Sequence, residues 1–183
     1  MQEDFAHAFE GRLAALGRAN SVISPQGSVD LARLLKHELM GVCGDLSRFT
    51  LNGPDVAIGQ DCAFALDLLF HELACNATQH GSLSVSKGRV DVSWHVENGM
   101  LVLAWAETSD LSVQQPLSHG IGNFLIKHTA AKLKGTADLL YLHSGFRCEL
   151  RVSLSACWPD RRAALQLAKK PAHAASLLTR YEQ

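Results

Sequence analysis

Apolar residues recur every three or four positions in four segments of the chain, which is the spacing of an amphipathic α-helix. The third segment is apolar around most of its circumference and therefore predicts a largely buried helix. Either Ser28 or Asp30 can cap the second helix, which ends near Gly44, and Gly135 is the expected C-cap of the fourth. The predicted helices span residues 3–23, about 30–44, 60–81 and 123–133.

Alternating apolar and polar residues predict strands between and after these helices. Residues 48–51 are short and β-prone, and Asn52-Gly53-Pro54 then breaks the segment. The step Asn98-Gly99 joins two longer alternating runs, and such a step is a strong signal for a β-hairpin. A second hairpin is expected around Ser144-Gly145. The longer strands are predicted at residues 89–96, 100–107, 137–142 and 147–154.

This order of elements predicts an α+β fold, a two-layer sandwich in which helices cover one face of a mixed, mostly antiparallel sheet. The chain of 183 residues can bury one full core beside a small helical appendage. We therefore expect a helical, dimerisation-type region at residues 1–44, a main domain at 45–157 and a helical appendage at 158–183.

Charge and cysteine content narrow the possible classes of function. The formal net charge is −1 and no basic patch stands out, so nucleic acid is not an expected partner. No apolar run approaches the roughly 20 residues that cross a bilayer, so no membrane contact by this chain is expected. The five cysteines include no CxxC pair and follow no secretory leader, which is most simply explained by reduced thiols in the cytoplasm.

A polar stripe on the third predicted helix is the most informative feature for function. Glu72 and Asn76 are four residues apart, and Gln79 and His80 continue the stripe along an otherwise apolar helix. Burial of such groups costs free energy unless they meet partners or a ligand. The spacing alone is equally typical of a solvated helix face, and His71 alone is more often a hydrogen-bonded structural histidine.

Two further features have both functional and ordinary explanations. Gly120-Ile121-Gly122 precedes a helix, where glycines let a backbone approach a phosphate and the helix N-terminus offers free N–H groups. An ordinary turn that leads into a helix would show the same glycine pattern. Trp105 and Glu107 share one face at the end of a strand, although Trp105 can also be a core residue.

In combination these motifs are ordered and specific. They are His71-Glu72-Leu-x-x-Asn76-Ala, Gly81-Ser82-Leu83-Ser84, Gly88-Arg89-Val90, Trp94, Trp105-x-Glu107, Gly120-x-Gly122-x-x-Leu125-Ile126 and Gly145-x-x-Cys148-x-Leu150. The set closely resembles the catalytic ATP-binding domain of the HWE histidine kinases, over about residues 1–155. The resemblance implies the GHKL, or Bergerat, fold shared with gyrase and MutL, and makes the first two helices look like the end of a dimerisation region. The apolar faces of these helices favour a homodimer, and packing on their own domain is the alternative.

The resemblance implies ATP and Mg²⁺ as cofactors and assigns the metal and the chemistry to one helix. Asn76 would bind Mg²⁺, which bridges the phosphates and offsets their charge. Glu72, with His71 beside it, would orient or deprotonate the attacking group, or hold metal-bound water.

The nucleotide itself would be held by residues from several motifs. Glu107 would accept a hydrogen bond from the adenine amino group. Gly120 and Gly122 would border the phosphates at the end of a lid formed by the polar stretch 108–119. Gln79 and His80 would lie near the phosphates at the end of their helix.

The chain also departs from the family pattern. Gln79 replaces the lysine that the family usually carries, and Thr108-Ser109-Asp110 replaces a glycine pair. The phosphoacceptor helix that should precede Phe5 is absent, so the acceptor histidine is expected in another chain or a missing region, with a response regulator as the next partner. A stand-alone GHKL kinase acting on a partner protein and a degenerate, non-catalytic interaction module remain alternatives to the sensor kinase.

Overall fold

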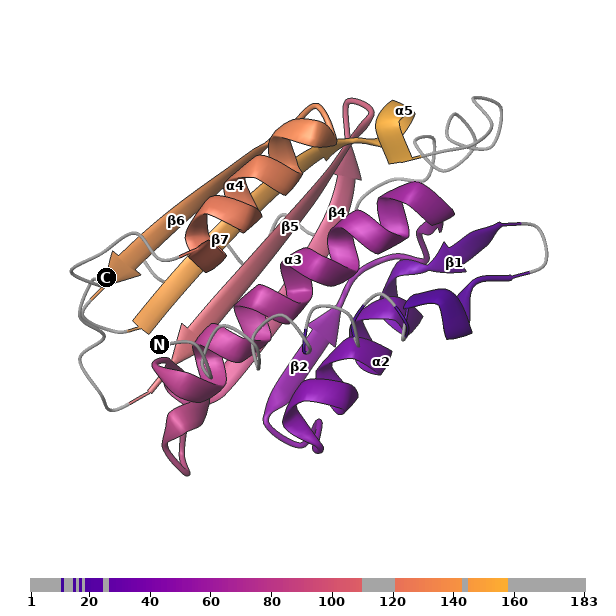
Figure 1. The fold of residues 1–183 in the computed structure, drawn as a ribbon. Coiled ribbons are helices and arrows are strands. Elements are labelled where there is room, and N and C mark those ends of the chain that lie inside the picture. The colour runs from indigo at the N-terminus through magenta and orange to yellow at the C-terminus, as the bar shows by residue number, and fades with distance from the viewer. Residues whose placement is uncertain are drawn as a thin grey trace.

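A computed structural model describes residues 11, 15, 17, 19–24, 27–109, 121–142 and 145–157. They form a five-stranded sheet in the order β2-β4-β5-β7-β6, with helices on one face (Figure 1). β2 pairs in parallel with β4 and the other neighbours are antiparallel, which confirms the predicted mixed α+β sandwich. The strands are β2 (Phe49–Asn52), β4 (Arg89–Glu97), β5 (Met100–Thr108), β6 (Thr136–Leu142) and β7 (Gly145–Ser153).

Three helices lie side by side over the sheet, with α3 between α2 and α4 (Figure 1). They are α2 (Leu31–Cys43), α3 (Gln60–Gln79) and α4 (Ile121–Lys132). Leu69 and Leu73 of α3 are fully buried, as is Trp105 on the sheet, because the apolar stripe of α3 faces the inward side chains of the strands. Burial of one such leucine stabilises the fold by about 2 kcal/mol.

Turn and cap residues act as the sequence predicts at several points. Asn98 and Gly99 both have positive φ, 49° and 77°, as a two-residue hairpin turn requires. Asp30, rather than Ser28, caps α2, since its carboxylate accepts from the Arg33 backbone N–H at 2.9 Å. Gly44 ends α2 in the left-handed conformation, with φ 70°.

The predicted C-cap of α4 is wrong by one residue. Lys134, with φ 54°, takes the left-handed position, and the Gly135 N–H bonds to the Ala130 carbonyl at 3.0 Å. Gly135 is instead required by packing, because a Cβ there would collide with the backbone carbonyl of Arg151 on β7.

The sequence patterns did not predict four short elements of the structure. β1 (Ser28–Asp30) and β3 (Ala57–Gly59) form a separate two-stranded sheet, while a 3₁₀ turn (Ser82–Ser84) and α5 (Leu154–Cys157) flank the main sheet. Segments of three or four residues are too short to show a period, and their partners lie far away in sequence.

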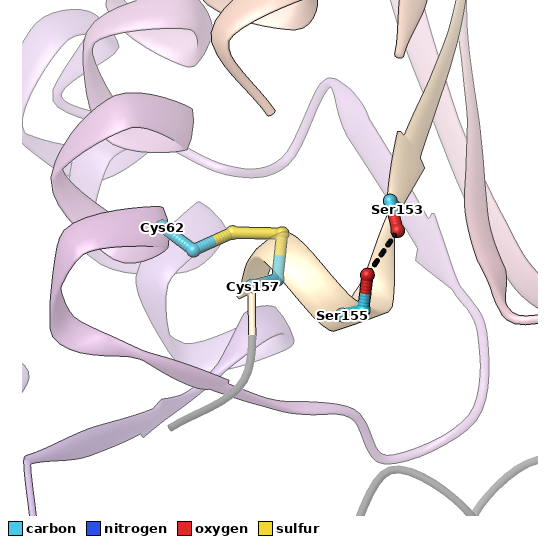
Figure 2. Close-up of a disulfide and its surroundings, with 4 residues drawn as sticks. All are labelled: Cys62, Ser153, Ser155 and Cys157. Carbon is cyan, nitrogen blue, oxygen red and sulfur yellow. Dashed lines mark hydrogen bonds between the residues drawn. A yellow bond between two sulfur atoms is a disulfide. The ribbon is translucent and has the colours of Figure 1, made fainter. Parts of the chain in front are cut away.

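A disulfide joins Cys62, near the start of α3, to Cys157 at the end of α5 (Figure 2). The two Cα atoms are 4.7 Å apart although the residues are 95 positions apart in sequence. The expectation of reduced thiols is therefore wrong for this pair, because only the folded chain brings the two residues together. Cys43, Cys75 and Cys148 carry free thiols.

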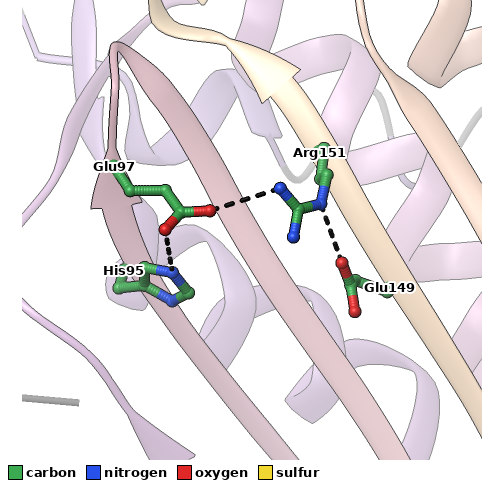
Figure 3. Close-up of polar contacts among 4 residues, drawn as sticks. All are labelled: His95, Glu97, Glu149 and Arg151. Atoms are coloured by element: carbon green, nitrogen blue, oxygen red, sulfur yellow. Dashed lines mark hydrogen bonds and ion pairs between the residues drawn. The ribbon is translucent and has the colours of Figure 1, made fainter. Parts of the chain in front are cut away.

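The sheet face opposite the helices carries an exposed polar network (Figure 3). Arg151 donates to Glu149 at 2.8 Å and to Glu97 at 3.2 Å, and His95 lies 3.6 Å from Glu97. Exposed ion pairs of this kind stabilise little, so we interpret this face as solvated. Within the described ranges, no helix combines the length and apolar character needed to span a membrane.

Candidate active site

Residues from two separate sequence motifs meet between α3 and α4. A Cβ placed on Gly122 would lie 2.9 Å from Glu72 Oε2, and 3.6 and 3.7 Å from Asn76 Nδ2 and Oδ1. Glu72 is 5% exposed and Asn76 is half-buried. Any side chain at 122 would press on the carboxylate, so glycine keeps this junction open to the polar stripe of α3.

The donor atoms at this junction suit a hard divalent cation. Mg²⁺ is bound in proteins by one or two carboxylate or amide oxygens together with water and substrate phosphates. Glu72 and Asn76 supply one carboxylate and one amide oxygen. Over the part of the chain that is described, no group of three His, Cys, Asp or Glu side chains could hold a metal ion by itself. The site therefore fits a cation that arrives with phosphate ligands.

Glu107 lies at the end of β5 with its carboxylate buried and oriented by two donors. Its Oε2 accepts from the Ser82 backbone N–H at 2.8 Å, and its Oε1 accepts from Trp105 Nε1 at 3.1 Å. Burial raises the pKa of Glu107, and the bonds from Ser82 and Trp105 partly offset this rise. Each carboxylate oxygen has a second lone pair, so the group can still accept a hydrogen bond from a ligand.

Two glycines pack directly against Glu107. A Cβ on Gly81, after the end of α3, would collide with the Glu107 carboxylate, and one on Gly145, at the start of β7, would collide with its carbonyl oxygen. Trp105 is fully buried, as expected for a core residue, and its indole also donates a hydrogen bond that orients Glu107. The Trp-x-Glu motif is thus a hydrogen-bonded pair on one strand face.

Replacing Trp105 by Phe is expected to raise the pKa of Glu107 further, because the indole bond lowers it. Titration of the Glu107 carboxyl carbon by NMR in wild type and variant measures the change. Trp94→Phe is the control, since the Trp94 indole donates to the Pro54 carbonyl and not to a carboxylate. An unchanged pKa in Trp105→Phe would show that the indole does not stabilise the ionised form.

His71 makes its described contacts on the side of α3 that faces α2. Its Nδ1 lies 2.8 Å from Glu38 Oε1, and its Nε2 lies 3.5 Å from Cys75 Sγ. Burial opposes the positive charge, but bonds and charges from Cys75 and Glu38 outweigh it and raise the pKa of His71 to about 9. The structure therefore places His71 in an ion pair, while the adjacent Glu72 lies at Gly122.

The raised pKa predicts a pH-dependent stability. The ion pair stabilises the fold fully below the ordinary histidine pKa of 6.5, and this contribution disappears as pH rises through about 9. The loss is expected to be on the order of 3 kcal/mol. Urea denaturation at several pH values should show a steeper fall for wild type than for His71→Gln. Parallel curves for the two proteins would exclude this contribution.

Comparisons with known proteins agree with these observations. A family model described as HWE histidine kinase matches residues 1–55. Blue-light-activated histidine kinase 1 of Erythrobacter litoralis (strain HTCC2594) is 37% identical over 106 residues, and a blue-light-activated histidine kinase of Rhizobium johnstonii is 26% identical over 153. Over these ranges the chain is similar to the HWE histidine kinase model and to blue-light-activated histidine kinases. The alignments cover 56% and 81% of this chain but 29% and 44% of the two relatives, so the chain spans less than half of their length.

Solved structures of histidine kinases share the fold of this chain. The histidine kinase domain of the Erythrobacter litoralis EL346 blue-light-activated histidine kinase matches with a TM-score of 0.61 at 17% identity, covering 84% of this chain and 83% of that one. The catalytic domain of histidine kinase ThkA matches with a TM-score of 0.57 at 10% identity, covering 69% and 94%. The fold is therefore that of histidine kinase catalytic domains, as the sequence resemblance implied.

The contacts that define the junction of Glu72, Asn76 and Gly122 in the described residues do not include the other predicted site residues. Gln79 and His80 are exposed at the end of α3. Gly120 and the predicted lid, apart from its first residues Thr108 and Ser109, lie outside the described residues. Sequence reasoning missed Glu38, although a carboxylate on the apolar side of a predicted helix was a visible signal for a buried partner.

Proposed function

We propose that this chain is the Mg²⁺·ATP-binding catalytic domain of a two-component sensor histidine kinase. In this role it transfers the γ-phosphoryl group of ATP to a histidine supplied outside this chain, and ADP leaves. The observation that carries the proposal is the meeting of Glu72 and Asn76 with Gly122, at the junction of α3 and α4.

At this junction Asn76 and Glu72 are the residues that would hold Mg²⁺. The cation, when bound, neutralises phosphate charge that would otherwise repel the nucleophile. The Glu72 carboxylate can also accept the N–H of the attacking imidazole, which orients its other nitrogen toward the phosphorus. Gly122 leaves room for a phosphate beside these groups, and Gly120, Gln79 and His80 are proposed to lie along the same phosphate chain.

Adenine recognition is assigned to Glu107. Its carboxylate is held by Ser82 and Trp105 and retains lone pairs for the adenine amino group. A carboxylate fixed before binding loses little side-chain entropy when the nucleotide arrives, which favours affinity. Glu107 also lies against Gly81, at the end of the helix that bears Asn76, so one helix connects the two ends of the proposed site.

The domain roles, protein partners and location are proposed from the resemblance to the HWE histidine kinases. We assign a dimerisation-type role to residues 1–44, the catalytic domain to 45–157 and an appendage to 158–183. The acceptor histidine and a response regulator are the proposed protein partners, in a homodimer that works in the cytoplasm. Activation by blue light is a property in the names of the two relatives, not of this chain.

Calorimetric titration with a non-hydrolysable ATP analogue, with and without Mg²⁺, tests the proposed site. Saturable binding that strengthens with Mg²⁺ is the expected result. Glu107→Gln is expected to weaken the binding of adenosine as well as of the analogue, because an amide replaces one acceptor oxygen with a donor. Folded wild-type protein that binds no nucleotide would overturn the proposal and favour an interaction module.

A further inference from the structure

Glu38 is a charged residue buried in an apolar environment. Its side chain has no exposed surface, and its neighbours on α2 include the fully buried Leu34, Leu35 and Leu39. Its Oε1 lies 2.8 Å from His71 Nδ1 on α3. Removing two charges from water costs several kcal/mol per ion, and well-packed apolar residues of similar volume are often at least as stable. Stability alone therefore explains this ion pair poorly.

A hydrogen-bonded ion pair between two helices fixes their relative orientation more specifically than contacts between leucine side chains do. The Glu38–His71 bond restrains rotation of α3 about its own axis, because it joins one named atom on each helix. His71 immediately precedes Glu72, and Cys75, whose Sγ lies 3.5 Å from the His71 ring, immediately precedes Asn76. A rotation of α3 that moves His71 must also move Glu72 and Asn76 away from Gly122.

Gly11 lies close to the same imidazole ring. A Cβ on Gly11 would lie 3.0 Å from His71 Nε2, so the backbone at Gly11 packs close to the ring. His71 is thus contacted by Gly11 and Glu38 from the predicted dimerisation-type region, and it lies beside the proposed metal ligands. The ring is one of the points at which these two parts of the chain meet.

We propose that Glu38 is a positioning residue that acts through His71 and holds α3 so that Glu72 and Asn76 face Gly122. This inference rests on the proposed function, and it makes the Mg²⁺-dependent part of nucleotide binding depend on a residue of α2. Adenosine binding, which needs only Glu107 at the other end of the proposed site, does not depend on Glu38.

The test measures two quantities on the full chain by calorimetry. One is the affinity for adenosine, and the other is the gain in affinity for a non-hydrolysable ATP analogue when Mg²⁺ is added. Glu38→Gln is expected to reduce this gain about tenfold, because loss of a residue that orients metal ligands typically lowers metal affinity by about 10- to 100-fold. Adenosine affinity is expected to stay unchanged. Glu149→Gln, which removes an exposed carboxylate from the outer sheet face (Figure 3), is the matched control and should keep the whole gain.

A double variant, Glu38→Leu with His71→Leu, separates positioning from stability. It removes both charges and fills the space with apolar side chains, so it is expected to unfold at a urea concentration no lower than wild type. Loss of the Mg²⁺-dependent gain in this stably folded protein supports the inference. A full gain in either variant overturns it and leaves the proposed function intact. A wild-type protein without any gain refutes the proposed function, and the inference falls with it.

Discussion

Asn76→Ala is expected to abolish the Mg²⁺-dependent part of ATP binding while the protein remains folded. Asn76 is half-buried on the stripe of α3 that faces Gly122, and its amide oxygen is one of two proposed metal ligands. Loss of a residue that only orients a metal ligand lowers metal affinity by about 10- to 100-fold, so loss of a ligand itself should weaken Mg²⁺-dependent analogue binding by about 100-fold or more. Alanine is the best helix former, so α3 itself should not be destabilised.

Calorimetry with adenosine and with the ATP analogue checks this result. Adenosine affinity should be unchanged, because Glu107 lies beside Gly81 beyond the end of α3. Asn52→Ala, an exposed asparagine at the end of β2, is the matched control and should bind the Mg²⁺ complex as wild type does. An equal loss of adenosine binding in Asn76→Ala would indicate damage to the fold, and an unchanged Mg²⁺ response would exclude Asn76 as a ligand.

Reduction of the Cys62–Cys157 disulfide is expected to lower the free energy of unfolding by about 4–5 kcal/mol. The bond closes a loop across 95 positions of sequence, and a cross-link over about 100 residues restricts the unfolded chain by roughly this amount. For a chain of this size, such a change corresponds to a decrease of about 10–20 °C in melting temperature. The bond also ties the first turn of α3, the helix that bears Glu72 and Asn76, to α5 (Figure 2).

Thermal and urea unfolding with and without reductant, together with the intact mass, checks the disulfide. The double variant Cys62→Ser with Cys157→Ser should unfold at a lower temperature than wild type and lose its sensitivity to reductant. Cys43→Ser, which changes a half-buried free thiol, should keep that sensitivity. A wild-type protein that is reduced by mass yet equally stable would contradict the expected loss.

Local patterns in the sequence predicted the helices and turns whose conformation depends on residues nearby in the sequence. The hairpin at Asn98-Gly99 follows from the tolerance of these two residues for positive φ. The buried helix α3 follows from its apolar circumference, and its stripe correctly put Glu72 and Asn76 on one side. Where two local signals competed, as at Ser28 and Asp30, the pattern could not choose, because the choice depended on where β1 ends.

The sequence by itself therefore determined the class of fold, the family resemblance and the residue types of the candidate site. Tertiary structure decided which of these residues meet: Gly122 with Glu72 and Asn76, and Glu38 with His71. It also decided the disulfide partners and the parallel pairing of β2 with β4. The physical reason is that helix and turn preferences arise from residues a few positions apart, whereas these contacts join distant segments whose approach only the packed core defines.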